Sequence, residues 1–330
     1  MTHNWHIRPY RHGDEKQILK LRQTVFGDLD PVRLKEFTWR WQFQNNPAGK
    51  ATCFLAESNG EIVGQYVTIP TRFSIHGKDA ILAFSCDTMI HPGFRRQGMF
   101  SALASELYDS LEARHSINLV WGFPNDQSLR GFTGKLGWRM LPTIPLMVMP
   151  IKPLGMMFKA LPLFNHLRKS PPASIKPDAD VIFSTKNQRL HMDPIEHFDE
   201  TFDALWQEHS TTAPVMQVRD SRYLQWRYLS VPEFGYRPFA VRRDGLLLGY
   251  WVIRMMSLKG QTFGVLVDLF PFPLESFSVL GEIFSFAKRF VKAHGGDFLT
   301  CLLPRRQTGI LKKAGFRQVP EMINPKTWRL

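Results

Sequence analysis

The chain has 330 residues, enough for two domains of ordinary size, and its 44% hydrophobic content excludes a disordered or low-complexity protein. Its 42 Lys and Arg outnumber 29 Asp and Glu, but the excess is spread along the chain and forms no basic run typical of nucleic-acid binding. A dispersed positive charge of +13 suits an anionic small-molecule ligand, and it is equally compatible with a role in general solubility.

The cysteines and the hydrophobic stretches bear on the cellular compartment. Cys53, Cys86 and Cys301 are far apart and form no C-x-x-C pair, so neither a disulfide framework nor a metal site is predicted. Residues 1–10 are polar and lack the apolar core of a signal peptide. The most apolar stretch, 142–164, is interrupted by five prolines and two lysines, which argues against a membrane span. We therefore expect a cytoplasmic protein, either a monomer or a dimer.

Several sequence features occur twice in the same order, which suggests a duplicated domain. Trp39-Arg40-Trp41 in the first half is aligned with Trp226-Arg227-Tyr228 in the second. Each is followed by a proline and by an apolar run that ends in a hairpin signal, Asn59-Gly60 or Asp244-Gly245. In this alignment the offset between the copies falls from 187 to 185 and then to 178 residues along the chain.

In each copy a further strand is predicted to end near an aspartate, Asp87 or Asp268, and a long helix follows. The first helix begins after Gly98 and the second spans about 275–294. Both place apolar residues on one face at helical spacing: Met99, Leu103, Leu107 and Leu111 in the first, and Leu280, Phe284, Ala287 and Val291 in the second. Antiparallel strands followed by strand, helix and strand predict an α+β fold with a mixed, mostly antiparallel sheet in each copy.

Between the predicted strand and the first of these helices, the segment from Ile90 to Ser101 has the chemistry of an anion-binding turn. Backbone N–H groups at a helix start are unpaired and carry the positive end of the helix dipole. Gly98 allows a ligand to approach the main chain, Arg95 and Arg96 add positive charge, and Ser101 offers a hydroxyl. The segment suits a phosphate or pyrophosphate, and the alternative is an ordinary strand-to-helix turn with solvated arginines.

The pattern Ile90-x-Pro92-x-x-Arg95-x-x-Gly98 before an amphipathic helix resembles the coenzyme A motif of the GNAT N-acetyltransferase superfamily. The strand at 119–123 and the segment from Asn125 to Gly137-Trp138 are similar to the elements that follow this motif in the family. The resemblance covers residues 5–150. It implies a GNAT-like fold for both copies, the second of them degenerate.

The resemblance also implies a set of site residues. Met89 and Ile90 would offer backbone groups to the pantetheine arm and the acetyl carbonyl, and Asn125 would contact coenzyme A from the next loop. Asp87 is the candidate general base, with Cys86 as an acyl-carrying nucleophile the alternative. The pyrophosphate would be wrapped by Arg95, Arg96, Gln97, Gly98, Met99, Phe100 and Ser101.

The first copy departs from the family pattern in three respects. Phe100 stands where the family has a second small residue, and this narrows the phosphate loop unless the ring points away. The family often places a proton-donating tyrosine in the last helix, where this chain has Phe132 or Thr133. Asp87 has a repeat partner in Asp268, which favours a structural role for it.

The second copy lacks the Arg-x-x-Gly pattern altogether. Pro271 and Pro273 remove amide donors at the matching place, and Glu275 would repel a phosphate. We therefore predict that the second copy does not bind coenzyme A.

The predicted domains are a GNAT domain with the coenzyme A motif at 1–150, a linker at 151–180 and a degenerate GNAT-like domain at 181–330. In the linker, the Met-rich segment 155–161 is interpreted as a helix that connects the domains. A peripheral membrane or acyl-chain contact along 151–169 is the alternative.

The implied function is direct transfer of an acetyl group from acetyl-CoA to an amine in a ternary complex, with no metal. A small-molecule or sugar amine is the favoured acceptor, and nucleic acid is not an expected partner. The alternatives are transfer of a longer acyl or an aminoacyl group, and a non-catalytic sensor or scaffold that binds coenzyme A.

Overall fold

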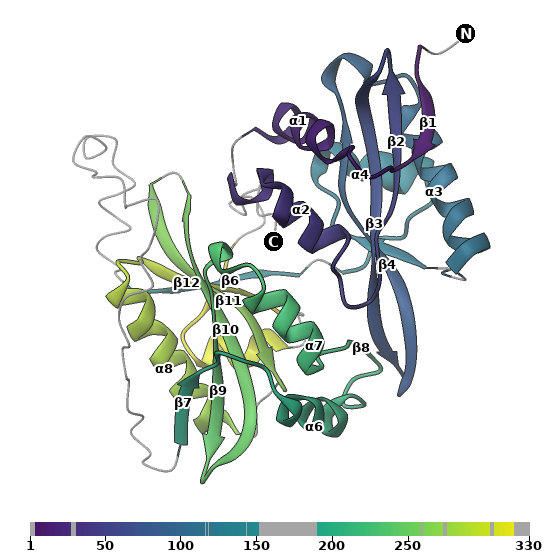
Figure 1. The fold of residues 1–330 in the computed structure, drawn as a ribbon. Coiled ribbons are helices and arrows are strands. Elements are labelled where there is room, and N and C mark those ends of the chain that lie inside the picture. Colours follow the sequence, from purple (N-terminus) through teal and green to yellow (C-terminus); the bar gives the residue numbers. More distant parts are fainter. Residues whose placement is uncertain are drawn as a thin grey trace, which may run out of the picture. The chain divides into compact units, whose positions relative to one another are not determined.

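The computed structural model describes residues 4–27, 31–115, 117, 119–142, 144–151, 190–258, 260–272, 276–303 and 307–319. These fall into two compact units, each described by itself (Figure 1). The first takes in Met1–Met140 and Trp206–Glu233, and the second takes in Leu141–Leu205 and Phe234–Pro325. Each unit contains one mixed sheet flanked by helices, which confirms the predicted α+β class. The linker helix predicted at 155–161 lies outside the described residues.

The first sheet has the order β1-β2-β3-β4-β5, antiparallel except for the parallel pair β4–β5, and β8 pairs with the far end of β3. Its strands are β1 (His6–Pro9), β2 (Thr52–Ser58), β3 (Glu61–Ile75), β4 (Lys78–Ile90), β5 (Val120–Gly122) and β8 (Val215–Gln217). One face carries α1 (Glu15–Phe26), η1 (Pro31–Leu34) and α2 (Glu36–Phe43). The other face carries η2 (Pro92–Phe94), α3 (Met99–His115) and α4 (Asp126–Lys135).

Helix α3 is held unusually close to the sheet. The four apolar residues predicted on its buried face are all at most 2% exposed. Gly64 on β3 makes this approach possible, because a Cβ on Gly64 would lie 2.6 Å from the sulfur of Met99 and 3.2 Å from Cδ1 of Leu103. The start of α3, and with it the predicted phosphate loop, is therefore positioned by a glycine on the neighbouring strand.

The segment 206–233 joins the first unit although it comes from the second half of the sequence. It contains the end of α6 (Glu200–His209), β8, α7 (Ser221–Leu224) and η4 (Gln225–Leu229), and η5 (Pro232–Phe234) follows. Asp220 caps the start of α7 and also forms an ion pair with Arg72 of β3. Backbone pairing and this ion pair together attach the segment to the first sheet.

The second sheet has the order β13-β6-β12-β11-β10-β9-β7, antiparallel except for the parallel pair β11–β12. Its strands are β6 (Leu146–Pro150), β7 (Leu190–Pro194), β9 (Tyr236–Arg243), β10 (Leu246–Leu258), β11 (Gln261–Phe270), β12 (Phe298–Leu302) and β13 (Arg317–Gln318). Strand β6 lies inside the range 1–150 predicted for the first domain, yet it pairs with β12 and β13 of the second sheet. The sheets and the halves of the sequence therefore do not coincide.

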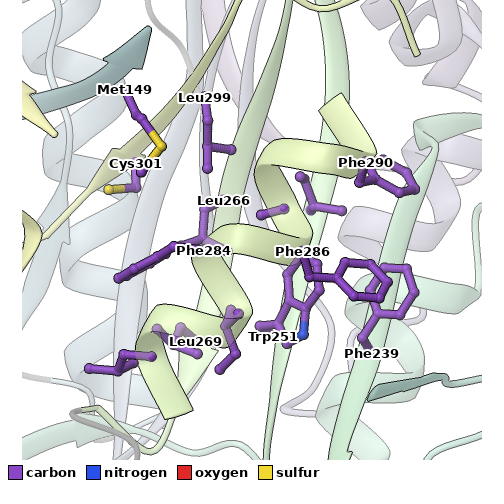
Figure 2. Close-up of a cluster of buried hydrophobic side chains, with 14 of the residues drawn as sticks. Met149, Phe239, Trp251, Leu266, Leu269, Phe284, Phe286, Phe290, Leu299 and Cys301 are labelled. Atoms are coloured by element: carbon purple, nitrogen blue, oxygen red, sulfur yellow. The ribbon is translucent and has the colours of Figure 1, made fainter. Parts of the chain in front are cut away.

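Helix α8 (Phe277–Ala293) buries its predicted apolar face against the second sheet, and α9 (Thr308–Lys313) adds a shorter helix. Figure 2 shows the resulting core, in which Phe286 of α8 meets Trp251 and Phe239 of the sheet. The rings of Phe239 and Trp251 stack at 4.7 Å, and Phe286 lies 5.3 Å from Trp251. This aromatic packing gives the second unit a continuous hydrophobic core of its own.

The two sheets share one topology over five strands. Strands β1 to β5 match β7 and β9 to β12 in order and direction, with a single parallel pair at the same end of each. Both predicted hairpin turns are present. Asn59-Gly60 and Asp244-Gly245 all have positive φ, the geometry of a type I′ turn.

The predicted alignment of the tryptophan motifs is wrong by two residues. Trp41 donates its indole N–H to the carbonyl of Trp226 at 2.8 Å, and Trp226 donates to the carbonyl of Trp41 at 3.0 Å. Such reciprocal contacts relate equivalent positions of two copies. The offset is then 185, the same as between Asn59 and Asp244. The similarity of Trp-Arg-Trp to Trp-Arg-Tyr had shifted the alignment.

Candidate functional site

The predicted phosphate loop connects the end of β4 to the start of α3. His91 begins the turn, because its Nδ1 accepts a hydrogen bond from the backbone N–H of Gly93 at 3.2 Å. Arg96 and Gly98 have positive φ values of 65° and 81°, and they turn the backbone into the helix, which begins at Met99. This agrees with the predicted strand, tight turn and helix.

The backbone N–H groups of residues 96–100 have no hydrogen-bond acceptor among the described residues. Consecutive unpaired amides in a turn with positive φ form a concave group of donors that binds anions, and the start of a helix adds the positive end of its dipole. The side chains of Arg95 and Arg96 are exposed beside them. Gly98 has nothing within 4 Å of the position where a Cβ would lie, so it keeps the loop open and permits the left-handed backbone.

Phe100 points away from the loop. Its ring packs 5.2 Å from Phe132 of α4 and 5.9 Å from Tyr66 of β3. The ring also lies close to Gly131, because a Cβ on Gly131 would be 2.9 Å from it. The bulky residue at this position is therefore accommodated in the core between α3 and α4.

Asn125 begins helix α4. Its side chain accepts a hydrogen bond from the backbone N–H of Ser128 at 2.9 Å, and the Ser128 hydroxyl accepts one from the backbone N–H of Asn125 at 3.1 Å. This capping box fixes the helix start beside the splayed strands. The predicted contact of Asn125 with coenzyme A stays a prediction.

Strands β4 and β5 separate beside the loop. They pair only from Ala83 to Ser85, where Ser85 lies opposite Gly122, and β4 then continues to Ile90 paired with β3 but not with β5. A Cβ on Gly122 would lie 2.9 Å from the Ser85 carbonyl oxygen and 3.3 Å from the Trp138 ring. Beyond Ser85, one edge of β4 has no neighbouring strand in the described part of the chain. That edge can pair with an extended ligand that has amide groups.

Asp87 lies at a bulge in β4 with a positive φ of 46°. Its carboxylate accepts from Arg22 of α1 at 2.6 Å, and both side chains are largely buried. The Gln65 side chain holds the bulge by donating to the Asp87 carbonyl at 2.9 Å. Met89 and Ile90 pair with Gln65 and Gly64, and the Met89 side chain is buried in the core. Only its main chain is therefore available at this edge.

The repeat partner of Asp87 has a different environment. In the second unit, Asp268 accepts a hydrogen bond from the Tyr250 hydroxyl at 2.9 Å. Both aspartates thus have a partner: Arg22 pairs with Asp87, and Tyr250 donates to Asp268.

Cys86 lies next to Asp87 and is held in the protonated form. Burial raises the pKa of its thiol, and the neighbouring Asp87 charge raises this pKa further. Gln42 of α2 lies 3.6 Å from the sulfur. Because the thiolate is the nucleophilic form, this environment does not favour the alternative in which Cys86 carries the acyl group.

A buried chain of hydroxyl groups lies beside the gap between β4 and β5, and the sequence analysis missed it. The hydroxyls of Tyr66 and Tyr108 are 2.8 Å apart, Ser85 donates to Tyr66 at 3.2 Å, and Trp138 donates to Tyr108 at 3.0 Å. Burial raises the pKa of both tyrosines. Their positions in β3 and α3, 42 residues apart, leave no local sequence signal.

The matching place in the second unit is built differently. The start of α8 is capped by the Ser276 side chain, which accepts from the backbone N–H of Val279 at 3.4 Å. Pro271 follows β11 and offers no amide. Pro273 and Glu275, which the sequence analysis also invoked, lie outside the described residues. That this copy does not bind coenzyme A stays a prediction.

Comparisons with known proteins agree with this geometry. The family description "Acetyltransferase (GNAT) domain" matches residues 6–141, which include the loop, the bulge and α4. Residues 6–141 are therefore a GNAT domain. The chain's two GNAT-like lobes extend the family fold beyond the matched domain.

Several solved structures share this fold. N-myristoyltransferase from Saccharomyces cerevisiae with bound myristoyl-CoA is similar with a TM-score of 0.63 and 13% identity, over 96% of this chain and 77% of that one. A GCN5-related N-acetyltransferase from Anabaena variabilis has a TM-score of 0.63 and 12% identity, over 96% and 70%. A probable N-acyltransferase from Enterococcus faecalis gives 0.63 and 11%, over the same shares. No curated protein sequence matches the chain.

Metal ligands and membrane-spanning helices were both considered for the described residues. Within the described residues, no three His, Cys, Asp or Glu side chains lie close enough together to share a metal ion. None of the helices in that part of the chain combines the length and apolar character needed to cross a membrane.

Proposed function

We propose that this GNAT protein transfers an acetyl group from acetyl-CoA to the amine of a small molecule. The observation that carries the proposal is the row of unpaired amides at 96–100, at the start of α3 and beside the open edge of β4. In the proposed complex these amides, together with Arg95 and Arg96, hold the pyrophosphate. The pantetheine arm, which contains amide groups, lies along β4 beyond Ser85.

In this proposal the thioester lies at the bulge of β4. Backbone groups of Met89 and Ile90 bind the acetyl carbonyl and stabilise the oxyanion that develops when the amine attacks. Asp87 is the candidate general base and accepts the amine proton directly or through one water. The Tyr66 and Tyr108 hydroxyls are fixed beside the gap and keep their protons, so they offer neutral donors near the departing thiolate.

The packing on the α3 side of the gap between β4 and β5 supports the transfer of a short acyl group. The Trp138 ring lies against Gly122 and 4.4 Å from Phe132, and it fills the space beside the separated strands. Because a long acyl chain needs a continuous apolar channel, this packing favours acetyl over myristoyl transfer. The N-myristoyltransferase with the same fold makes the longer donor the alternative to test.

The test is calorimetric titration of acetyl-CoA and myristoyl-CoA into the full-length protein and its Gly98→Asp variant. We expect acetyl-CoA to bind the wild type and to bind the variant about 100-fold more weakly, because the variant places a negative charge at the phosphate position. Gly60→Asp is the matched control. Its φ of 78° imposes the same backbone strain in a hairpin turn of the same unit.

Three results of this titration would contradict different parts of the proposal. If the control loses binding as Gly98→Asp does, the effect arises from general destabilisation, and the loop is not the phosphate site. If only myristoyl-CoA binds, the acetyl donor is wrong. If neither donor binds the wild type, the acyltransferase proposal is overturned.

A further inference from the structure

Strand β5 and the residues beside it present apolar side chains on one face of the first sheet. β5 is the last strand of that sheet in the described part of the chain. Leu119, Trp121 and Phe123 alternate along this segment, and alternate residues of an extended chain point to the same face. Leu119 is 49% exposed and Phe123 is 71% exposed. Exposed apolar side chains that gather in one patch mark a binding surface, whereas scattered ones need no explanation.

Four aromatic rings gather here into a cluster that we call the aromatic shelf: Phe73, Phe84, Trp121 and Phe123. Trp121 lies opposite Phe84 of β4, and the two ring centroids are 4.5 Å apart. Phe73 of β3 meets the Trp121 ring edge to face at 5.6 Å. Phe123 lies 5.8 Å from Trp121 and 6.2 Å from Phe84. Three of the four rings belong to paired strands, so the sheet holds the shelf in place.

The aromatic shelf borders the gap in which the thioester is proposed to lie. Phe84 precedes Ser85, the last β4 residue that pairs with β5, and Phe123 follows Gly122, the partner of Ser85. Phe123 is therefore the first residue on its side where the two chains separate. Phe84 packs with Cys86 against the core formed with α1 and α2, which places the shelf on the sheet face opposite α3. The pyrophosphate is proposed to lie at the start of α3, so the shelf borders the gap on the face that remains open to the acceptor.

The polar surroundings of the shelf indicate the kind of acceptor. The indole N–H of Trp121 is the only polar side-chain group among the four residues, and it donates to the Thr71 hydroxyl at 3.1 Å. That hydroxyl donates in turn to the carbonyl of Leu82 at 2.9 Å. The four side chains thus offer a ligand ring faces and edges, on which a flat aromatic ring stacks well. A sugar amine instead needs hydrogen-bond partners for its hydroxyl groups.

The second copy shows that the fold does not require these rings. In each sheet we compare the pair that precedes the last pair of the parallel ladder. It is Phe84 with Trp121 in the first sheet and Val265 with Thr300 in the second. Val265 and Thr300 are 4% and 1% exposed. The same ladder can thus be built from small buried residues, and the large rings occur in the copy that has the phosphate loop.

We propose that the aromatic shelf binds the acceptor and that the acceptor is a primary amine with an aromatic ring on a short carbon chain. The inference rests on the proposed function for the identity of the reaction, but binding of the amine can be measured without it. The acceptor ring stacks on Phe123 and contacts Trp121, and its amino group reaches the thioester at the gap between β4 and β5. The shelf therefore selects the acceptor by its ring, apart from the residues that bind coenzyme A.

The experiment measures binding of benzylamine, phenethylamine and tryptamine to the full-length protein by calorimetry, with and without coenzyme A, beside glucosamine and butylamine. We expect at least one aromatic amine to bind, and glucosamine and butylamine to bind at least about tenfold more weakly, because neither has an aromatic ring to stack. Phe123→Ala is expected to weaken binding of the aromatic amine about tenfold. Because the Phe123 ring is 71% exposed, the urea midpoint of this variant should equal that of the wild type.

Phe277→Ala is the matched control, because it makes the same substitution at a ring that is 50% exposed at the start of α8 in the second unit. The proposal is overturned if no aromatic amine binds, if glucosamine or butylamine binds equally well, or if Phe123→Ala binds like the wild type or like Phe277→Ala. It is also overturned if Phe123→Ala changes the oligomeric state in light scattering, because the shelf is then an interface between copies. Failure of the proposed function looks different, because binding of the aromatic amine then persists in a protein that binds no acyl-CoA.

Discussion

Trp41 and Trp226 stack with their ring centroids 4.9 Å apart, and each donates its indole N–H to the backbone carbonyl of the other. They lie 185 residues apart in the chain, and within the first unit they join α2 to the segment 206–233. Together with β8 and the ion pair between Arg72 and Asp220, this pair makes a segment from the second half of the sequence part of the first unit.

Replacing Trp226 with Phe keeps an aromatic ring but removes one of the two donors. It leaves the Trp41 carbonyl without this hydrogen bond, so we expect the free energy of unfolding of the first unit to fall by about 1–3 kcal/mol. Urea denaturation of Trp41→Phe, Trp226→Phe and the double variant measures both the loss and the coupling. A double variant whose loss equals the sum of the single losses would show that the two bonds are independent of each other.

The close approach of α3 to the sheet makes Gly64 sensitive to the smallest substitution. We expect Gly64→Ala to lower the free energy of unfolding by about 1–3 kcal/mol, because the added Cβ overlaps the buried Met99 sulfur. Gly134→Ala in α4 is the matched control. No atom lies within 4 Å of the new Cβ there, and alanine favours the helix by about 0.5–1 kcal/mol. Chemical denaturation compares the two, and equal effects would contradict this account of the packing.

The stability of the first unit should depend on acidic pH through Arg8. The hydrogen bond from Arg8 lowers the pKa of Glu57 from 4.5. Burial alone would raise the pKa of Asp14, but hydrogen bonds from Arg8 and the Arg11 backbone outweigh it and lower this pKa from 3.8. Both carboxylates therefore contribute stability that is complete above pH 4.5. This stability is lost as the pH falls through their folded pKa values.

The Arg8→Met variant tests this dependence. We expect it to be less stable at neutral pH and to lose less further stability on acidification than the wild type, as measured by denaturation at a series of pH values. Lys20→Met breaks an ion pair with Glu61 whose side chains are 74% and 69% exposed, so its profile should follow that of the wild type. Parallel wild-type and Arg8→Met profiles would refute the assignment.

Tyr108→Phe removes the hydroxyl that connects Tyr66 with Trp138. We expect a loss of about 1–2 kcal/mol in the free energy of unfolding, because the partly buried Trp138 N–H loses its acceptor. If the hydroxyl also assists departure of the thiolate, the rate of transfer falls while the affinity for acetyl-CoA stays unchanged. Stopped-flow measurement of the transfer step, beside calorimetry, separates these effects. A variant that loses stability alone assigns Tyr108 a structural role.

The elements with local signals could be predicted from the sequence. The Asn59-Gly60 and Asp244-Gly245 turns follow from residues that tolerate positive φ, and α3 and α8 follow from apolar spacing. The strand, turn and helix around Gly98 were predicted for the same reason. Each of these depends on neighbours within a few residues, so the pattern carries the information.

Features that depend on long-range packing could not be predicted. Nothing within the sequence of β6 indicates which sheet it joins, and the side of α3 on which Phe100 packs depends on Gly131 of another helix. Arg22, Arg33 and Asp87 come from separate elements and line one small pocket, and only Asp87 was singled out from the sequence. The two-residue error at Trp41 arose because identical letters were aligned without knowledge of which residues face each other.

Strand β6 makes the two halves of the gene product interdependent. A polypeptide ending at residue 150 would carry β6 without β12 and β13, the strands that pair with it on either side. A polypeptide beginning after it would expose the edges of β12 and β13, and unpaired edges of this kind favour aggregation. Neither half of the chain can therefore be transferred to another protein without a strand from the other half, because β6 pairs with β12 and β13, and β8 pairs with β3.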